Sequence, residues 1–321
     1  MTDSADPGLS VETAPASGYE APLATPYVAA PVRRRRPSSF TTLRVAVLDM
    51  NNGVANQGMR CLRQILNAFD NQIDGLSVLW DEFDVRRQNQ VPDLRYDLYL
   101  CSGGPGSPLE SEGSEWEARY FGLLNALRAH NADAENPRKY AFLICHSFEL
   151  AVRHYGLCDL VPRQSESFGI FPVHPVGAGF DDPIFEGLPD PFMGADFRSW
   201  QCITPHHEAF ERLGAEVLAI EKDRPHLEFE RAVMAIRFTP EIVGTQFHPE
   251  ADPSGMLLHF RKEHRREMIV ETHGEAKYRS ILDQILSPVG LPMTFSTLLP
   301  NFLRDTVLRL RQSHASDPSP A

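Results

Sequence analysis

The sequence lacks any long hydrophobic run: no stretch approaches the roughly 18 to 20 consecutive apolar residues that cross a bilayer. Its first residues also lack the basic start and apolar core of an export signal. Basic residues are in deficit, since 31 Lys and Arg stand against 43 Asp and Glu, for a formal net charge of -12. A surface of that sign repels a phosphate backbone. We therefore expect neither a membrane nor a nucleic acid as partner.

Cysteine is scarce as well. The five cysteines are odd in number and scattered along the chain, at Cys61, Cys101, Cys145, Cys158 and Cys202. This excludes a disulfide framework and a paired zinc-ligand pattern, and it favours a reducing, cytoplasmic location. Two adjacent histidines, His206 and His207, invite a metal interpretation, but neighbours on a helix face different directions and no third ligand is evident. We expect no metal and no other cofactor.

What the sequence does contain is a composition typical of a folded protein, with 42% hydrophobic and 23% charged residues. Residues 1–40 depart from it, because they hold six prolines and almost no bulky apolar side chains. Such a segment cannot bury enough surface to offset the entropy of ordering, which predicts a disordered tail. The tail ends in four arginines, Arg33 to Arg36, which we interpret as a solvated basic patch, because no apolar helix follows them.

Residues 41–287 alternate short apolar runs with helical periodicity. Strands are predicted at 44–49, 76–80, 97–101, 139–145, 168–173, 200–203, 215–220, 232–238 and 242–247. Helices are predicted at about 59–69, 115–130, from 148 onward and 254–286. This alternation predicts one α/β domain with a mostly parallel central sheet that helices cover on both faces.

Residues 288–321 form a predicted C-terminal extension with a disordered end. Its apolar residues recur at three- and four-residue spacing: Leu298, Leu299, Phe302, Leu303, Val307 and Leu310. The spacing predicts an amphipathic helix. The apolar face of that helix either docks on the same chain or forms the contact of a homodimer, and the sequence leaves both open.

Three separated segments that follow predicted strands carry the chemistry. Residues 102–108 read Ser-Gly-Gly-Pro-Gly-Ser-Pro, whose glycines leave backbone amides uncovered to face an anion. Cys145 ends an apolar strand where a helix begins at once, and a helix N-terminus favours the thiolate. His248 and Glu250 follow a third strand and lie two residues apart, so the carboxylate can orient the imidazole. Together they match a nucleophile, its base and an orienting group.

These segments resemble those of the class I glutamine amidotransferases, whose triad is Cys, His and Glu. The resemblance covers about residues 44–286, and its most specific parts are the glycine turn, the strand-Cys-helix elbow and Gly-Thr-Gln-Phe-His-Pro-Glu at 244–250. It implies a single amidotransferase-like α/β domain and glutamine as the substrate. No P-loop or appended synthetase domain is visible in the sequence, so an ammonia acceptor would belong to a partner synthetase in trans.

The resemblance also implies roles for individual residues. Cys145 would be the nucleophile, His248 the general base and acid, and Glu250 the group that orients the histidine. The backbone amides of Gly104 and His146 would form the oxyanion hole. In the family reaction the thiolate attacks the glutamine side-chain amide, ammonia leaves, and water releases glutamate from the thioester.

The elbow departs from the family pattern Gly-x-Cys-x-Gly-x-Gln, because this chain has Leu143, Ser147 and Glu149 at the conserved places. Ser147 is small enough to be tolerated, whereas Leu143 requires local repacking. Glu149 replaces a glutamine that helps to hold the substrate, so we expect Glu149 to bind substrate with altered charge and hydrogen bonding. The Phe148-Glu149 pair is similar to the elbow of γ-glutamyl hydrolases.

A second departure lies at residues 196–200, where many amidotransferases have a His-Gly-Asp segment and this chain reads Asp-Phe-Arg-Ser-Trp. Arg198 is predicted to bind a substrate carboxylate bidentately. A similar Ser-Arg pair occurs in homoserine acyltransferases, which share the fold and triad. The alternative interpretation of Arg198 is a surface arginine.

The sequence thus predicts a cysteine amidase that acts on glutamine or a γ-glutamyl compound through a thioester. Two alternatives within the same fold are a γ-glutamyl hydrolase and a homoserine acyltransferase-like enzyme. A third is a catalytically retired binding or regulatory protein, which the unusual residues Leu143 and Glu149 motivate.

Overall fold

The computed structural model describes residues 41–54, 56–223 and 230–315. The predicted disordered tail, residues 1–40 with its arginine run, and the predicted disordered end at 316–321 lie outside the described residues. The division into a tail, a body at 41–287 and an extension from 288 stays a prediction. None of the helices in the described ranges combines the length and the apolar character that crossing a bilayer requires.

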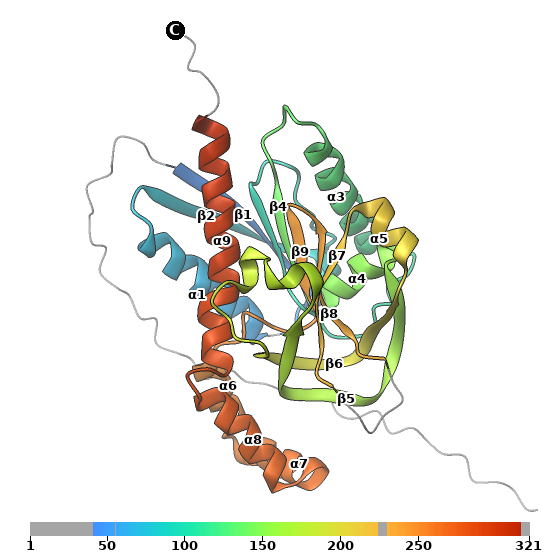
Figure 1. Ribbon diagram of the computed structural model, residues 1–321, viewed down its shortest axis with the longest axis vertical. Helices are drawn as coiled ribbons and strands as arrows, with labels where there is room; N and C mark the ends of the chain where they lie inside the picture. Colours follow the sequence, from blue (N-terminus) through green and yellow to red (C-terminus); the bar gives the residue numbers. More distant parts are fainter. Residues whose placement is uncertain (1–40, 55, 224–229, 316–321) are drawn as a thin grey trace, which may run out of the picture. The chain divides into compact units, whose positions relative to one another are not determined.

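A sheet of nine strands in the order β2-β1-β3-β4-β9-β8-β7-β5-β6 forms the centre of the described chain (Figure 1). The strands are β1 (Thr41–Asp49), β2 (Leu76–Asp84), β3 (Leu98–Cys101), β4 (Tyr140–Ile144), β5 (Cys158–Pro175), β6 (Phe192–Pro205), β7 (Glu216–Glu221), β8 (Val233–Thr239) and β9 (Ile242–Thr245). Neighbours from β2 to β9 pair in parallel, and those from β9 to β6 pair antiparallel. The predicted α/β class is therefore confirmed, with a sheet that is mixed.

The connections explain why the two halves of the sheet differ. Parallel neighbours need crossover connections, and helices supply them between β1 and β2 and between β3 and β4. By contrast, β8 and β9 are joined by a turn of two residues, which permits only antiparallel pairing. The half that carries the predicted nucleophile is thus the parallel one.

Helices lie on both faces of the sheet. They are α1 (Gln57–Gln72), α2 (Val85–Gln88), α3 (Glu115–Ala132), α4 (His146–Tyr155), α5 (His207–Leu213), α6 (Pro253–Phe260), α7 (Glu263–His273), α8 (Glu275–Leu286) and α9 (Leu291–Ala315), with short 3-10 turns η1 (Gly177–Phe180) and η2 (Pro183–Phe185). Side-chain caps fix where some begin. The Asn56 side chain accepts from the Gly58 amide at α1, and Asp252 accepts from the Gly255 amide at α6.

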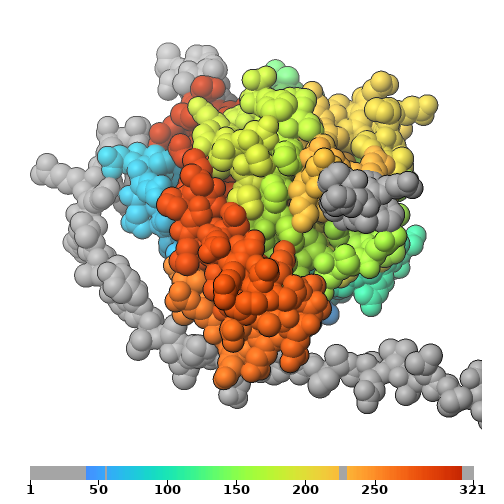
Figure 2. Space-filling model, turned by 60° about the horizontal axis from the view of Figure 1, so that its bottom comes forward, coloured from blue at the N-terminus to red at the C-terminus, as the bar shows by residue number. Residues whose placement is uncertain are grey.

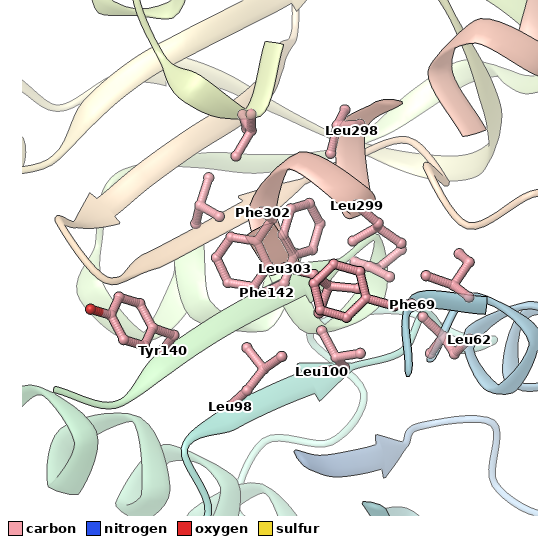
Figure 3. Close-up of a cluster of buried hydrophobic side chains, with 14 of the residues drawn as sticks. Leu62, Phe69, Leu98, Leu100, Tyr140, Phe142, Leu298, Leu299, Phe302 and Leu303 are labelled. Atoms are coloured by element: carbon pink, nitrogen blue, oxygen red, sulfur yellow. The ribbon is translucent and has the colours of Figure 1, made fainter. Parts of the chain in front are cut away.

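The C-terminal helix α9 docks on the same chain, on the face of the sheet that also carries α1 (Figure 1). All six residues of its predicted apolar stripe are buried. In Figure 3, Phe302 of α9 lies against Phe142 of β4, and the two ring centroids are 5.1 Å apart in an edge-on arrangement. Side chains of α1, among them Phe69, complete this core. The amphipathic helix therefore buries its stripe within the chain.

Helices α3 and α4 cover the opposite face of the parallel half, where Leu124 and Phe148 pack with Leu48 and Leu143. A third cluster joins α6, α7 and α8 to the antiparallel half, where Ile281 packs with Ile170 and Ala195. Figure 2 shows the orange atoms of α7 and α8 next to the yellow-green atoms of the β5 and β6 region. These layers bring the ends of β3, β4 and β9 together.

Candidate active site

Cys145 lies between the last residue of β4 and the first residue of α4, with a positive φ of 50° and ψ of -104°. A positive φ is costly for a residue with a side chain, so neighbouring groups must hold the turn. The Cys145 amide donates to the carbonyl of Thr245 at 2.8 Å, and its carbonyl accepts from the Glu149 amide at 2.9 Å. The cysteine is thus fixed between the end of β9 and the first turn of α4.

The leucine two residues before the cysteine is accommodated by a glycine on the neighbouring strand. Leu143 is fully buried and pairs in register with Gly244 of β9. A Cβ at Gly244 would lie 3.0 Å from the Leu143 Cβ, 2.9 Å from its carbonyl oxygen and 3.0 Å from Phe148 Cδ2. The absent side chain at Gly244 therefore supplies the space, and this is the form that the expected repacking around Leu143 takes.

Ser147 replaces the second glycine of the elbow without leaving a polar group unsatisfied. Its hydroxyl oxygen accepts from the Ile144 amide at 2.8 Å and lies 3.0 Å from the carbonyl oxygens of Cys101 and Ile144. The side chain is fully buried. A buried hydroxyl with partners costs little, so Ser147 supports the turn.

The structure places His248 and Glu250 beside Cys145. The His248 Nδ1 lies 2.7 Å from the Glu250 carboxylate, and its ring lies close enough to the Cys145 thiol for each to shift the pKa of the other. Because Nδ1 is bound to the carboxylate, Nε2 remains for the sulfur. The backbone amide of His248 donates to the Ala195 carbonyl of β6 at 2.8 Å. The His248 side chain is 20% exposed and that of Glu250 3%, so the ring is the accessible member of the pair.

The surroundings shift the pKa of both partners. Burial raises the pKa of the Cys145 thiol, and the neighbouring His248 acts in the opposite direction. Burial lowers the pKa of His248, but the Glu250 carboxylate and the Cys145 sulfur outweigh it, so that the pKa lies well above its usual value. The thiol thus resists losing its proton, and the ring beside it is stabilised in its protonated form, whereas the roles of the two side chains as nucleophile and base stay predictions.

The glycine turn after β3 passes directly over this pair. A Cβ at Gly103 would lie 2.8 Å from His248 Cε1 and 3.4 Å from the Cys145 Cβ, whereas one at Gly104 would collide with the Met50 carbonyl. In the part of the chain that the structure describes, the amides of Gly104 and His146 have no hydrogen-bond partner. Both can donate to an incoming group, and their role as oxyanion donors stays a prediction.

Glu149, predicted to bind substrate, is buried in the first turn of α4. Its Oε1 accepts from the Gln246 side-chain nitrogen at 2.9 Å. Burial raises the pKa of Glu149 to about 7, although Gln246 and Arg198 act against the rise. No second hydrogen bond to the carboxylate is found among the described residues, and its Oε2 lies 3.9 Å from His146 Nδ1.

The His146 ring is buried in the same region, with 1% of its side chain exposed. Neither ring nitrogen has a hydrogen-bond partner within the described residues. Burial lowers the pKa of His146 to about 3, and the nearby Arg86 and Arg153 add to the effect. This histidine is therefore neutral at physiological pH.

Arg198 is not a surface residue, so that alternative is wrong: it is 4% exposed. Its Nε donates to Asp196 at 2.9 Å, and Nη1 donates to the Trp200 carbonyl at 3.1 Å. Nη2 lies 3.6 Å from the Glu221 carboxylate, which also binds Arg163 at 3.1 Å. Arg198 thus belongs to a buried ionic network whose charge acts on Glu149, and its binding of a substrate carboxylate stays a prediction.

Gln246 is a site residue that the sequence analysis did not single out. It is fully buried, and its side-chain nitrogen lies 3.9 Å from the Cys145 sulfur. The signal was present in the sequence, because Gln246 directly follows β9 and stands two residues before His248 in the same segment.

The two adjacent histidines lie away from this site. The His206 ring is engaged at both nitrogens, with the Gly156 carbonyl at 2.8 Å and Asp159 at 3.0 Å. Throughout the described ranges, no three or more His, Cys, Asp or Glu side chains converge as a metal site would require.

The described structure is similar to known crystal structures. A glutamine amidotransferase from Thermotoga maritima is 17% identical and superposes with a TM-score of 0.58, over 83% of this chain and 98% of the other. A second protein, designated by a locus name, is 16% identical with a TM-score of 0.54, over 83% of this chain and all of the other. No protein-family model matches the sequence, and no curated protein matches it. The likeness shows that this chain has the fold of a glutamine amidotransferase.

Proposed function

We propose that the chain is a cysteine amidase of the glutamine amidotransferase type, which hydrolyses the amide of glutamine or of a γ-glutamyl compound. The observation that carries the proposal is the strained Cys145 at a strand-helix junction beside the His248 ring, with the Glu250 carboxylate 2.7 Å from His248 Nδ1. A nucleophile, a base and an orienting carboxylate in this order are what acyl transfer through a thioester needs. The fold likeness supports the same reaction class.

In the first half of the proposed reaction, His248 takes the thiol proton as the Cys145 sulfur attacks the amide carbon. A carbon-sulfur bond forms, and the carbonyl electron pair moves onto the oxygen. The amides of Gly104 and His146 donate to that oxyanion, a contact that becomes stronger as charge develops. Glu250 stabilises the imidazolium, because its carboxylate accepts from Nδ1.

In the second half, the imidazolium of His248 gives its proton to the amide nitrogen, the carbon-nitrogen bond breaks, and ammonia leaves. The acyl group remains on Cys145 as a thioester. His248 then takes a proton from water, and the resulting hydroxide attacks the thioester carbon. The sulfur leaves and recovers a proton from His248, which releases glutamate and restores the resting site.

The proposal assigns the ammonia to a partner synthetase in trans, as the sequence analysis expected. It also retains Glu149 as a substrate contact, because this carboxyl shares Gln246 with the nucleophile. Arg198 would reach a substrate carboxylate only by releasing one of its present partners, Asp196 or the Trp200 carbonyl.

The decisive experiment measures ammonia released from glutamine and from γ-glutamyl amides by the purified full-length chain. Cys145→Ala should abolish release, whereas Cys158→Ala, a matched change at a buried cysteine at the start of β5, should not. A preference for γ-glutamyl amides would assign the activity to hydrolysis without transfer. Thioester formation from an acyl-coenzyme A with no ammonia release would instead favour the acyltransferase alternative.

A second measurement does not depend on a partner. An electrophilic glutamine analogue should label the protein once, at Cys145, as located by peptide mass spectrometry. If neither labelling nor turnover occurs, the amidase proposal is wrong and the retired-scaffold alternative is favoured.

A further inference from the structure

The Gln246 side chain connects three other buried side chains around the nucleophile. Its nitrogen donates to Glu149 Oε1 at 2.9 Å and lies 3.9 Å from the Cys145 sulfur. Its oxygen accepts from the Cys202 thiol, with 3.7 Å between oxygen and sulfur. Gln246 and Cys202 are both 0% exposed, and Glu149 is 3% exposed. Water therefore does not compete for these contacts.

The partners at the two ends determine which way the amide points. Burial raises the pKa of Cys202 well above its usual value, so this thiol keeps its proton and acts as a donor. Glu149 Oε1 is an acceptor. A reversed amide would place its oxygen against a carboxylate oxygen and its N–H group against an S–H group. Only the observed orientation satisfies both ends.

Protonation of Glu149 leaves this orientation intact. When the carboxyl carries a proton on Oε2, Oε1 still accepts from Gln246. Oε2 faces the neutral His146 ring, whose Nδ1 is 3.9 Å away, and one small shift would let that nitrogen accept the proton. The other charged or titratable groups that act on Glu149 are Arg198 and Asp196 of β6 and His248 beyond β9.

We propose that Gln246 stabilises the Cys145 thiolate by directing an N–H group at the sulfur, and that Glu149 is the positioning residue that holds this orientation. An amide nitrogen has two hydrogens, and Glu149 uses one of them. The other is available to the sulfur, and a hydrogen bond to a charged acceptor is stronger than one to a neutral acceptor. The catalytic meaning of this arrangement rests on the proposed function, whereas its effect on the thiol does not.

This arrangement gives a physical reason for glutamate at position 149. A glutamine there could present either its oxygen or its nitrogen to Gln246, and in the second case the Gln246 oxygen would turn toward the thiolate. A carboxylate has no donor and excludes that state. Glutamate in place of the family glutamine thereby ensures that Gln246 presents its nitrogen, and not its oxygen, to the Cys145 sulfur.

The test measures the pKa of the Cys145 thiol directly, from the rate of alkylation by iodoacetamide between pH 5 and pH 10, followed on the Cys145 peptide by mass spectrometry. Gln246→Leu should move the midpoint up by about one pH unit, which leaves about tenfold less thiolate at neutral pH. The limiting rate at high pH should stay unchanged. Glu149→Gln should move the midpoint in the same direction by less, with about twofold to fivefold slower alkylation at neutral pH, because the loss of the Glu149 charge, which raises the Cys145 pKa, offsets part of the shift.

The matched control is Gln201→Leu, because Gln201 of β6 also binds a charged side chain, Arg163 at 3.0 Å, away from the sulfur. Its profile should overlay that of the wild type. An unshifted midpoint in Gln246→Leu overturns the proposal. If that variant does not fold, Glu149→Gln decides, since it retains a hydrogen-bonding side chain, and an unshifted midpoint there overturns the role of Glu149 and with it the proposal. A shifted midpoint in a protein that releases no ammonia would support this inference and contradict the proposed function.

Discussion

Two pairs of a histidine and a glutamate lie near Cys145, and they differ in spacing, distance, burial and pKa. His248 and Glu250 are two residues apart in the bend and turn that follow β9, 2.7 Å from each other, and His248 is partly exposed. His146 and Glu149 are three residues apart on a helix, 3.9 Å from each other, and both are buried. The first pair has a raised histidine pKa, and in the second the pKa of the histidine is lowered to about 3.

Both pairs consist of the same residue types, so the distance between the histidine and the carboxylate and the exposure of the ring to water decide which pair can perform acid-base chemistry. A carboxylate in hydrogen-bond contact stabilises the imidazolium, so the pKa of His248 is raised and its ring can hold a proton. His146 and Glu149 are 3.9 Å apart and buried, so the cost of removing a charge from water outweighs their mutual attraction. Burial therefore lowers the pKa of His146 and raises that of Glu149, which favours the neutral form of both. One pair is suited to proton transfer and the other to a fixed, neutral environment.

The strongest test of this comparison exchanges the histidines one at a time. His248→Asn should lower kcat for amide hydrolysis by about 10³ to 10⁴-fold, because the base that takes the thiol proton is lost. His146→Leu should reduce kcat by less than about tenfold, since it keeps the backbone amide. Ammonia release measures both, and losses of equal size would contradict the comparison.

The carboxylates give the next largest expected difference. Glu250→Gln should lower kcat about 10²-fold, because an amide can no longer stabilise the imidazolium or fix its tautomer. Glu149→Gln should stay within about tenfold of the wild type, since it acts on the sulfur only through Gln246. Steady-state kinetics at saturating substrate separate the two, and the reverse order of effects would be inconsistent with the assigned roles.

Stability against pH sharpens the comparison for Glu149. Its pKa is raised from 4.5 to about 7, so the folded state retains a proton that the unfolded state releases. This contribution is fully present below pH 4.5 and is lost as the pH rises through about 7. Glu149→Gln should therefore gain about 3 kcal/mol in unfolding free energy relative to the wild type between these limits.

Urea denaturation at both pH values measures this change, and Glu112→Gln at an exposed position corrects for the removal of a surface charge. A constant difference between Glu149→Gln and the wild type across this pH range would show that the carboxyl titrates normally.

The smallest expected effect has the opposite sign with pH and concerns His146. Its pKa is lowered from 6.5 to about 3, so the unfolded state binds a proton that the folded state refuses. The contribution of His146 to the unfolding free energy is fully present above pH 6.5 and is lost as the pH falls toward 3. At pH 5 the wild type should lose about 2 kcal/mol more than His146→Leu, relative to neutral pH. Parallel acid-unfolding curves for the two proteins would contradict a neutral buried ring.

Much of the parallel half of the fold could be predicted from the sequence, because its strands are buried on both faces and therefore read as continuous apolar runs. The strand predicted at 139–145 is observed at Tyr140–Ile144, one residue shorter at each end. Cys145 leaves the strand because its backbone turns to positive φ. The pattern of side chains marks burial and cannot show that change of conformation.

The antiparallel half was harder to predict. The strand expected at 168–173 is part of β5, Cys158–Pro175, and that expected at 200–203 is part of β6, Phe192–Pro205. The added part of β5, residues 158–167, is mostly exposed or half-exposed, whereas the added part of β6, residues 192–198, is mostly buried and includes the charged residues Asp196 and Arg198. Hydrophobic periodicity marks neither an exposed stretch nor a buried one that carries charged residues, so the predicted segments were too short.

In the candidate site, the sequence could locate groups whose relation is local. Cys145 stands at a strand-helix junction, and His248 and Glu250, which contact each other, are only two positions apart in the sequence. The contacts of Gln246 with Cys202 and Glu149 join residues 44 and 97 positions apart. Such contacts depend on how strands and helices are placed beside each other, which no local pattern specifies.

The close approach of Leu143 and Gly244 makes the elbow the joint product of two segments that are far apart in the chain. The Leu143 side chain of β4 packs against Gly244 of β9, where a side chain would collide with it. The elbow would therefore keep its conformation in another protein only if the neighbouring strand of that protein also had a glycine at this position. A design that transfers this turn to another scaffold, or that replaces Leu143 with glycine, must therefore choose residues 143 and 244 together.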